Sequence, residues 1–135
     1  GLDPAGPGFD QGLIDGTNLN VDDAEFVDII HTCAGFLGST QMLGHVDFFP
    51  NGGGPPQPGC SILKFYETCS HGRSWKLFAE SIRLDEAYMA RQCENWELLK
   101  NKKCGGDEVP MGETTPSHVR GIYYLETSDT KPYLL

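Results

Sequence analysis

The segment at residues 26–30, Phe-Val-Asp-Ile-Ile, limits what this chain can fold into more than any other feature. Its apolar side chains fall on both faces of an extended strand, which is typical of a buried parallel strand covered by helices. Residues 45–49, stopped by Pro50, and residues 122–125 predict two further strands. A parallel strand needs neighbours and crossover connections that three strands do not fully supply. We therefore expect an α/β fold with an incomplete, mostly parallel sheet, flanking helices and a missing partner segment.

Residues 70–82 predict the clearest helix, with Ser70 as its N-cap. One apolar face, with side chains at i, i+3, i+4 and i+7, consists of Trp75, Phe78, Ala79 and Ile82. A weaker helical pattern covers residues 94–102, where Trp96 and Leu99 lie on one side. We expect both helices to pack on the sheet through these apolar faces.

Composition narrows the class of protein. Hydrophobic residues make up 39% of the 135 residues, which is enough for a core and argues against disorder. The formal net charge of −9 argues against a nucleic-acid partner and against electrostatic docking on an anionic membrane. No apolar run is long enough to cross a bilayer, and because Gly1 opens directly into a turn sequence we expect no signal peptide in these residues. Because the chain opens in the middle of a motif, we expect it to be processed or truncated.

The five cysteines indicate an oxidising compartment. Cys60 and Cys69 enclose eight residues, and Cys93 and Cys104 enclose ten, so neither spacing resembles the CxxC pairs of a zinc site. Two local disulfides are the better interpretation, and they favour a secreted protein. Cys33 is then left over, either as a buried thiol or as a partner for a cysteine of another chain.

Among the four histidines, His71 is the best placed for chemistry. It follows the first disulfide-closed loop and opens the predicted helix, which fixes its backbone. His31 and His45 lie at strand ends, where hydrogen-bonded structural roles are expected, and His118 lies in a polar loop. Asp3 precedes a proline and is either a turn residue or a carboxylate that orients an imidazole at the carboxyl end of a strand.

Five blocks of sequence, in order and at similar spacing, resemble the pancreatic-lipase family, which includes triacylglycerol lipases and phospholipases A1. The blocks are GLDPAGP at residues 1–7, DAEFVDIIHT at 23–32, GHVDFFPNGG at 44–53, QPGC at 57–60 and CSHGRS at 69–74. The resemblance covers nearly the whole chain. It implies that residues 1–135 are the carboxyl-terminal half of the catalytic α/β-hydrolase domain of a secreted lipid ester hydrolase.

The resemblance also implies roles for individual residues. Asp3 matches the acid and His71 the base of a Ser-His-Asp triad. The nucleophile of the family lies in a Gly-x-Ser-x-Gly elbow upstream of the Asp block, and this chain contains no such motif, since Leu63 breaks the one that begins at Gly59. We therefore expect the chain alone to be inactive and to work with an amino-terminal half of the same domain, present as a second chain.

In this family the loop that matches residues 60–69 is the lid over the active site. Its apolar residues, expected to touch lipid, are Ile62, Leu63, Phe65 and Tyr66. So short a lid leaves room for a polar head group. The resemblance therefore favours a phospholipase A1 that acts at a membrane or micelle interface over a long-lid triacylglycerol lipase.

Some family members bind calcium in the loop before the strand at residues 26–30. Asp15, Asn20 and Asp23 could supply oxygen ligands here. A solvated acidic loop is the interpretation that we prefer, and we expect no cofactor.

The competing interpretation is a non-catalytic family member kept for lipid binding or storage, as in insect yolk proteins. The presence of Asp3, His71 and the pair Cys60 and Cys69 favours the enzyme, because a storage protein has no need of them. A serine in the elbow of the missing half would decide between the two.

Overall fold

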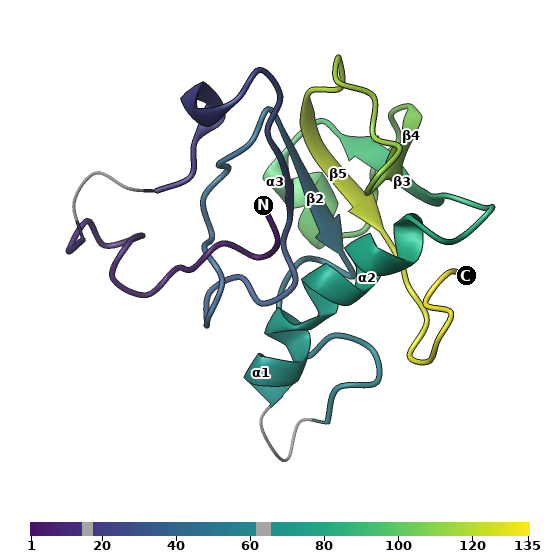
Figure 1. Ribbon diagram of the computed structural model, residues 1–135, viewed down its shortest axis with the longest axis horizontal. Coiled ribbons are helices and arrows are strands. Elements are labelled where there is room, and N and C mark those ends of the chain that lie inside the picture. The colour runs from purple at the N-terminus through teal and green to yellow at the C-terminus, as the bar shows by residue number, and fades with distance from the viewer. Residues whose placement is uncertain (15–17, 62–65) are drawn as a thin grey trace.

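The computed structural model describes residues 1–14, 18–61 and 66–135 of the chain. Among these residues, five strands form one sheet in the order β1-β2-β5-β3-β4. In Figure 1, α2 crosses one face of this sheet and α3 lies behind it. The elements in chain order are η1 (Val21–Asp23), β1 (Asp28–Ile30), β2 (Val46–Pro50), α1 (Tyr66–His71), α2 (Arg73–Ser81), β3 (Tyr88–Cys93), α3 (Trp96–Lys100), β4 (Glu108–Met111) and β5 (Gly121–Leu125).

The α/β class is confirmed, but the sheet is mixed. β1, β2 and β5, the strands expected from the sequence, pair in parallel, whereas β3 and β4 add to β5 in antiparallel fashion. The sequence pattern did not predict these two strands. β3 is amphipathic, with Tyr88 and Ala90 buried and Met89 exposed, and such a short alternation gave little signal. β4 contains Pro110, which an edge strand tolerates because, among the described residues, β3 is its single strand partner.

The amino-terminal segment supplies part of the neighbour that β1 needs. Leu2 forms a parallel bridge with Ile30. The Ile30 N–H donates to the Gly1 carbonyl at 2.9 Å, and the Asp3 N–H donates to the Ile30 carbonyl at 2.8 Å. Asp3 thus lies at the carboxyl end of a parallel strand segment, at the edge of the sheet where α/β proteins place functional groups.

Two apolar clusters cover the two faces of the sheet. On one face, Leu77 of α2 packs with Phe48 and Tyr123, whose ring centroids lie 5.5 Å apart. On the other face, Leu99 of α3 packs with Phe49, and the Trp96 ring meets Phe49 edge-on at 5.1 Å. The predicted role of Trp96 and Leu99 is therefore confirmed. Burial of these large side chains is the main source of stability on both faces.

The core-facing side of α2 differs in part from the expected one. Its buried residues are Arg73, Ser74, Leu77 and Ser81. Trp75 is 54% exposed, and Ile82, which follows the helix, is 57% exposed. Phe78 of the predicted apolar face does pack against the core cluster. The prediction was wrong for Trp75 and Ile82, because apolar periodicity does not distinguish a helix side that meets the core from one that lies outside it.

The start of the helical region also differs from the prediction. Ser70 lies inside α1 and is not an N-cap; its hydroxyl accepts a hydrogen bond from the Gln57 N–H at 3.0 Å. Helix formation begins earlier, at Tyr66, and a single residue, Gly72, separates α1 from α2. The stretch that was expected to be one helix is therefore two.

The structure pairs the cysteines as expected. Cys60 is joined to Cys69 and Cys93 to Cys104, with Cα–Cα distances of 5.7 and 4.5 Å. Cys33 is a buried free thiol, the first of the two alternatives.

None of the helices in the described ranges has the length and apolar character that crossing a bilayer requires.

The assignment of the α2 faces predicts a contrast between two substitutions. Leu77→Ala should lower the free energy of unfolding by about 2–5 kcal/mol, because it opens a cavity under the helix. Ile82→Ala should cost less than about 1 kcal/mol, because most of that side chain is already in contact with water. Urea unfolding followed by circular dichroism measures both, and equal losses would contradict the assignment.

Candidate active site

The structure brings together Asp3 and His71, which lie 68 residues apart in the chain. The Nδ1 atom of His71 lies 2.6 Å from Oδ2 of Asp3. The Asp3 carboxylate is fully buried, whereas 41% of the His71 side chain is exposed. The pair therefore has one shielded end, the carboxylate, and one accessible end, the imidazole.

Backbone amides hold the Asp3 carboxylate in place. Its Oδ1 atom accepts hydrogen bonds from the N–H groups of Thr32 and Cys33, at 2.7 and 2.9 Å. These two residues directly follow β1 and His31. Asp3 itself adopts a left-handed conformation with φ of 52°, which Asp tolerates better than most residues. With three donors on two oxygens, the carboxylate has one orientation.

Gly38 allows a second segment to pack against this carboxylate. A Cβ atom on Gly38 would lie 2.4 Å from Asp3 Oδ1 and 2.6 Å from Oδ2. Gly6 makes a similar close approach, since a Cβ there would lie 2.6 Å from the Gly38 carbonyl oxygen. Sequence reasoning missed Gly38, because it is one of several glycines in a loop and nothing local distinguishes it.

His71 is held by the helix that precedes it. It is the last residue of α1, not the first residue of a helix as expected, because α1 begins five residues earlier. Its carbonyl accepts a hydrogen bond from the Ser74 hydroxyl at 2.9 Å. The disulfide at Cys69 fixes α1 two residues before the imidazole. Since Nδ1 faces Asp3, Nε2 is the ring nitrogen that remains for a reacting group.

The other histidines have structural surroundings. His31 is buried, with Nε2 2.7 Å from Asp47 Oδ1 and its ring stacked on Phe49 at 4.5 Å. The His45 Nδ1 atom accepts a hydrogen bond from the Val27 N–H at 3.0 Å. His118 is exposed. None of the three contacts Asp3 through an interaction found among the described residues.

Cys33 lies beside the pair and contacts both Asp3 and α1. Its Sγ atom donates to the Glu67 carbonyl in α1 at 3.3 Å, while its N–H donates to Asp3 Oδ1. Burial raises the pKa of the Cys33 thiol and so favours the unreactive protonated form. Cys33 thus connects the end of β1 to the helix that carries His71.

Three of the expected lid residues, Ile62, Leu63 and Phe65, lie outside the described residues. Tyr66 is the first residue of α1. The structure therefore describes the two ends of the 60–69 loop, tied by the disulfide, and not its middle.

The oxygens proposed for calcium are used within their own turn. Asn20 Oδ1 accepts from the Asp22 N–H and Asp23 Oδ2 accepts from the Asn20 N–H, both at 2.8 Å, so the two residues form the capping box of η1. Asp15 lies outside the described residues. Within the described ranges, no group of three or more His, Cys, Asp or Glu side chains could hold a metal ion.

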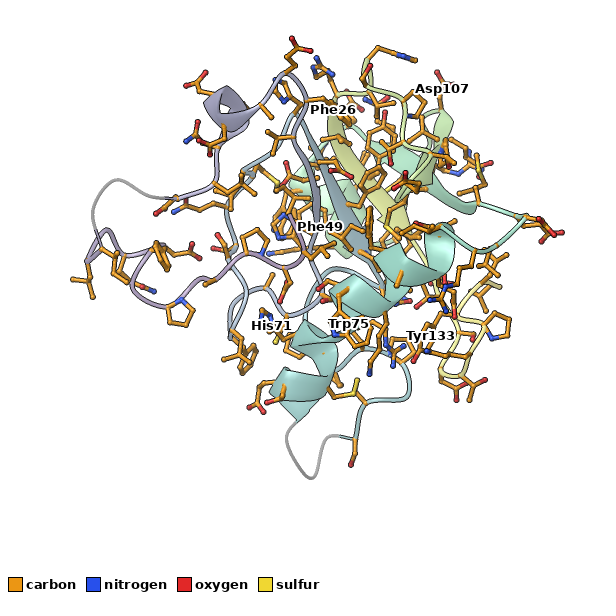
Figure 2. All side chains as sticks on the ribbon, in the orientation of Figure 1. Phe26, Phe49, His71, Trp75, Asp107 and Tyr133 are labelled. Atoms are coloured by element: carbon orange, nitrogen blue, oxygen red, sulfur yellow. A yellow bond between two sulfur atoms is a disulfide. The ribbon has the colours of Figure 1, made fainter. Side chains whose placement is uncertain are left out.

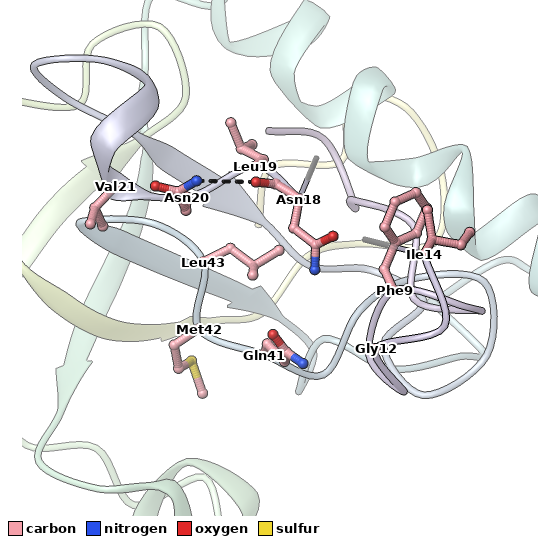
Figure 3. A pocket seen from close by; sticks show the side chains of 10 residues that line it. All are labelled: Phe9, Gly12, Ile14, Asn18, Leu19, Asn20, Val21, Gln41, Met42 and Leu43. Carbon is pink, nitrogen blue, oxygen red and sulfur yellow. Dashed lines mark hydrogen bonds between the residues drawn. The ribbon is translucent and has the colours of Figure 1, made fainter. Parts of the chain in front are cut away.

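Asn20 also lines an open pocket of about 560 Å³ beside η1 (Figure 3). Apolar side chains form much of its wall, among them Phe9, Ile14, Leu19 and Met42. The Asn20 amide donates to the Asn18 carbonyl at 3.2 Å across one side. Neither Asp3 nor His71 lines this pocket, so it is separate from the candidate site.

The close approach at Gly38 predicts that Gly38→Ala disturbs the pair without touching either member. The added methyl group would push against the Asp3 carboxylate, so the downfield NMR signal of the His71 Nδ1 proton should shift or disappear. Gly105→Ala is the matched control, because a Cβ there meets no atom within 4 Å. An unchanged signal in Gly38→Ala would contradict the packing described here.

Comparison with known proteins places this chain in a family. A family model described as Lipase matches residues 1–133. The chain is 39% identical to lipase member H of Oryctolagus cuniculus over 86% of the chain and 26% of that protein. It is 34% identical to pancreatic triacylglycerol lipase of Sus scrofa, over 98% of the chain and 36% of that protein. Inactive pancreatic lipase-related protein 1 of Canis lupus familiaris is also 34% identical, over the whole chain and 33% of that protein.

The chain spans only about a quarter to a third of the length of these relatives. The family match nevertheless covers nearly all of its residues, and it includes both members of the Asp3–His71 pair. The chain belongs to the lipase family, and specifically to the pancreatic-lipase family.

Proposed function

We propose that this chain supplies the acid and the base of a lipid ester hydrolase, with Asp3 orienting His71. The observation that carries the proposal is the short contact between a buried carboxylate and an accessible imidazole. Two residues so far apart in sequence meet in the geometry that acyl transfer by a serine nucleophile requires. Membership of the lipase family supports ester hydrolysis as the reaction class.

The proposed mechanism follows from the two ring nitrogens of His71. Nδ1 carries its proton toward Asp3, so Nε2 can take the proton of a serine hydroxyl as that oxygen attacks the ester carbonyl. Asp3 stabilises the imidazolium that forms, and its two amide contacts keep it in position while it does so. His71 then gives the proton to the leaving alcohol, and water releases the acyl group by the same steps.

The nucleophile comes from elsewhere in the domain. The serines nearest to His71 in sequence have other partners: the Ser74 hydroxyl donates to the His71 carbonyl, and the Ser70 hydroxyl accepts from Gln57. The sequence holds no Gly-x-Ser-x-Gly elbow. We therefore propose that an amino-terminal part of the same domain brings the serine, and that this chain alone does not hydrolyse esters.

We further propose phospholipid as the preferred substrate of a secreted enzyme. Only eight residues lie between Cys60 and Cys69, the loop that matches the lid of the family, and a short lid leaves room for a head group. The two disulfides fit an oxidising, extracellular compartment.

Replacing His71 by Ala in the protein with its serine-bearing part should lower turnover by about 10⁴- to 10⁶-fold, because triad members act as a unit. Asp3→Asn should cost about 10⁴-fold, since the amide no longer fixes the tautomer. His118→Ala is the control and should retain activity, because that residue is exposed and remote in sequence. The assay is fatty-acid release from phosphatidylcholine beside a triolein emulsion. Activity that survives His71→Ala would refute the base assignment, and faster cleavage of triolein would refute the substrate preference.

A second candidate is a lipase-like protein that binds lipid without cleaving it. The observation that favours it is the match, over the whole chain, to a relative whose name describes it as inactive. Labelling with a fluorophosphonate, which reacts only with an activated serine, separates the candidates. Labelling that depends on His71 supports the hydrolase; lipid binding without labelling supports the second candidate.

A further inference from the structure

Trp75 has an unusual position for a large apolar side chain. It lies in the first turn of α2 and is 54% exposed, while the core-facing side of the helix is formed by other residues. Its indole folds back over the turn that joins α1 to α2: the Nε1 atom lies 3.4 Å from the point that a Cβ of Gly72 would occupy. Figure 2 labels both His71 and Trp75 at this junction. Because Gly72 directly follows His71, the indole lies over the backbone next to the residue that carries the accessible imidazole.

A second segment with exposed apolar side chains also contacts the Asp3–His71 pair. Phe36 and Leu37 are exposed in the turn between Cys33 and Gly38. This turn is tied to the site at both ends, since Cys33 donates its N–H to Asp3 and Gly38 packs directly against the carboxylate. Exposed apolar side chains thus lie on two segments that carry or hold the reactive pair. Single exposed apolar residues are common on protein surfaces. Several of them near a reactive group are typical of a binding surface.

The charge next to Trp75 fits a phospholipid surface. The Lys76 ammonium lies 5.7 Å from the centre of the indole ring. An indole prefers the boundary between acyl chains and head groups, and a neighbouring ammonium can reach a phosphate while its stem lies along apolar surface. The net charge of −9 gives no general attraction to an anionic membrane, so such a contact is local and does not need anionic lipid.

We propose that Trp75, assisted by Lys76, contacts the phospholipid surface at the mouth of the Asp3–His71 site, so that substrate reaches His71 directly from the lipid layer. The inference rests on the proposed function, because it takes His71 as the base. It names a lipid-contact residue on α2, a helix whose apolar stripe was expected to belong to the core. If the remainder of the lipase domain covers Trp75 in place of lipid, the fluorescence experiment detects it.

The test measures quenching of tryptophan fluorescence by vesicles of brominated phosphatidylcholine. The protein is the full lipase carrying His71→Ala, so that the vesicles are not hydrolysed. Adding Trp75→Phe should remove the part of the quenching due to Trp75. Adding Trp96→Phe is the matched control and should leave quenching intact, because Trp96 packs on Phe49 at the opposite face of the sheet. Trp75→Ala should weaken partition onto the vesicles by about tenfold.

Quenching that does not change with Trp75→Phe overturns the inference. So does a Trp75 emission that is already blue-shifted in the free protein and insensitive to vesicles, because the rest of the domain then covers the residue. Fatty-acid release by the protein with His71 intact is measured separately and decides the proposed function. Release without Trp75 quenching refutes only the lipid contact. Trp75 quenching without fatty-acid release refutes only the proposed ester hydrolysis. Trp75 is then the lipid contact of a lipid-binding protein.

Discussion

The rest of the site depends on the hydrogen bonds of one buried carboxylate. Asp3 joins three separate parts of the chain: the amino-terminal segment that carries it, the two residues after β1 that donate to Oδ1, and the α1–α2 junction that presents His71. Each part supplies hydrogen-bond partners to the others, because a buried carboxylate or amide without a partner lowers the stability of the folded state. The imidazole has a defined orientation only while all three meet.

A second buried pair holds the frame around this carboxylate. His31 bonds Asp47 through Nε2, and Asp47 also accepts from the N–H groups of Leu43 and Gly44. His31 further donates its own N–H to the Phe48 carbonyl at 2.9 Å. These contacts fix the end of β1 just before the two amides that hold Asp3. On the other side, the Cys60–Cys69 disulfide anchors α1, so the acid and the base each have a rigid support.

The sequence predicted those features that leave a local or motif-level signal. The strands at β1, β2 and β5 are short apolar runs, the disulfides follow from close spacing, and Asp3 and His71 lie in recognisable blocks. It did not predict features set by tertiary packing. Gly38 matters because of a carboxylate 35 residues away, and Trp75 is outside because Leu77 occupies the core side of α2. β4 depends on pairing with β3 and has little apolar pattern of its own.

We propose that Asp3 and His71 are the acid and base of a serine hydrolase site. The most direct measurement is a crystal structure of the full protein after reaction with a serine-directed phosphonate. The account predicts a phosphonylated serine whose Oγ lies about 3 Å from His71 Nε2, with Asp3 still bonded to Nδ1. A labelled serine remote from His71, or an Asp3 carboxylate turned away from the imidazole, would contradict it.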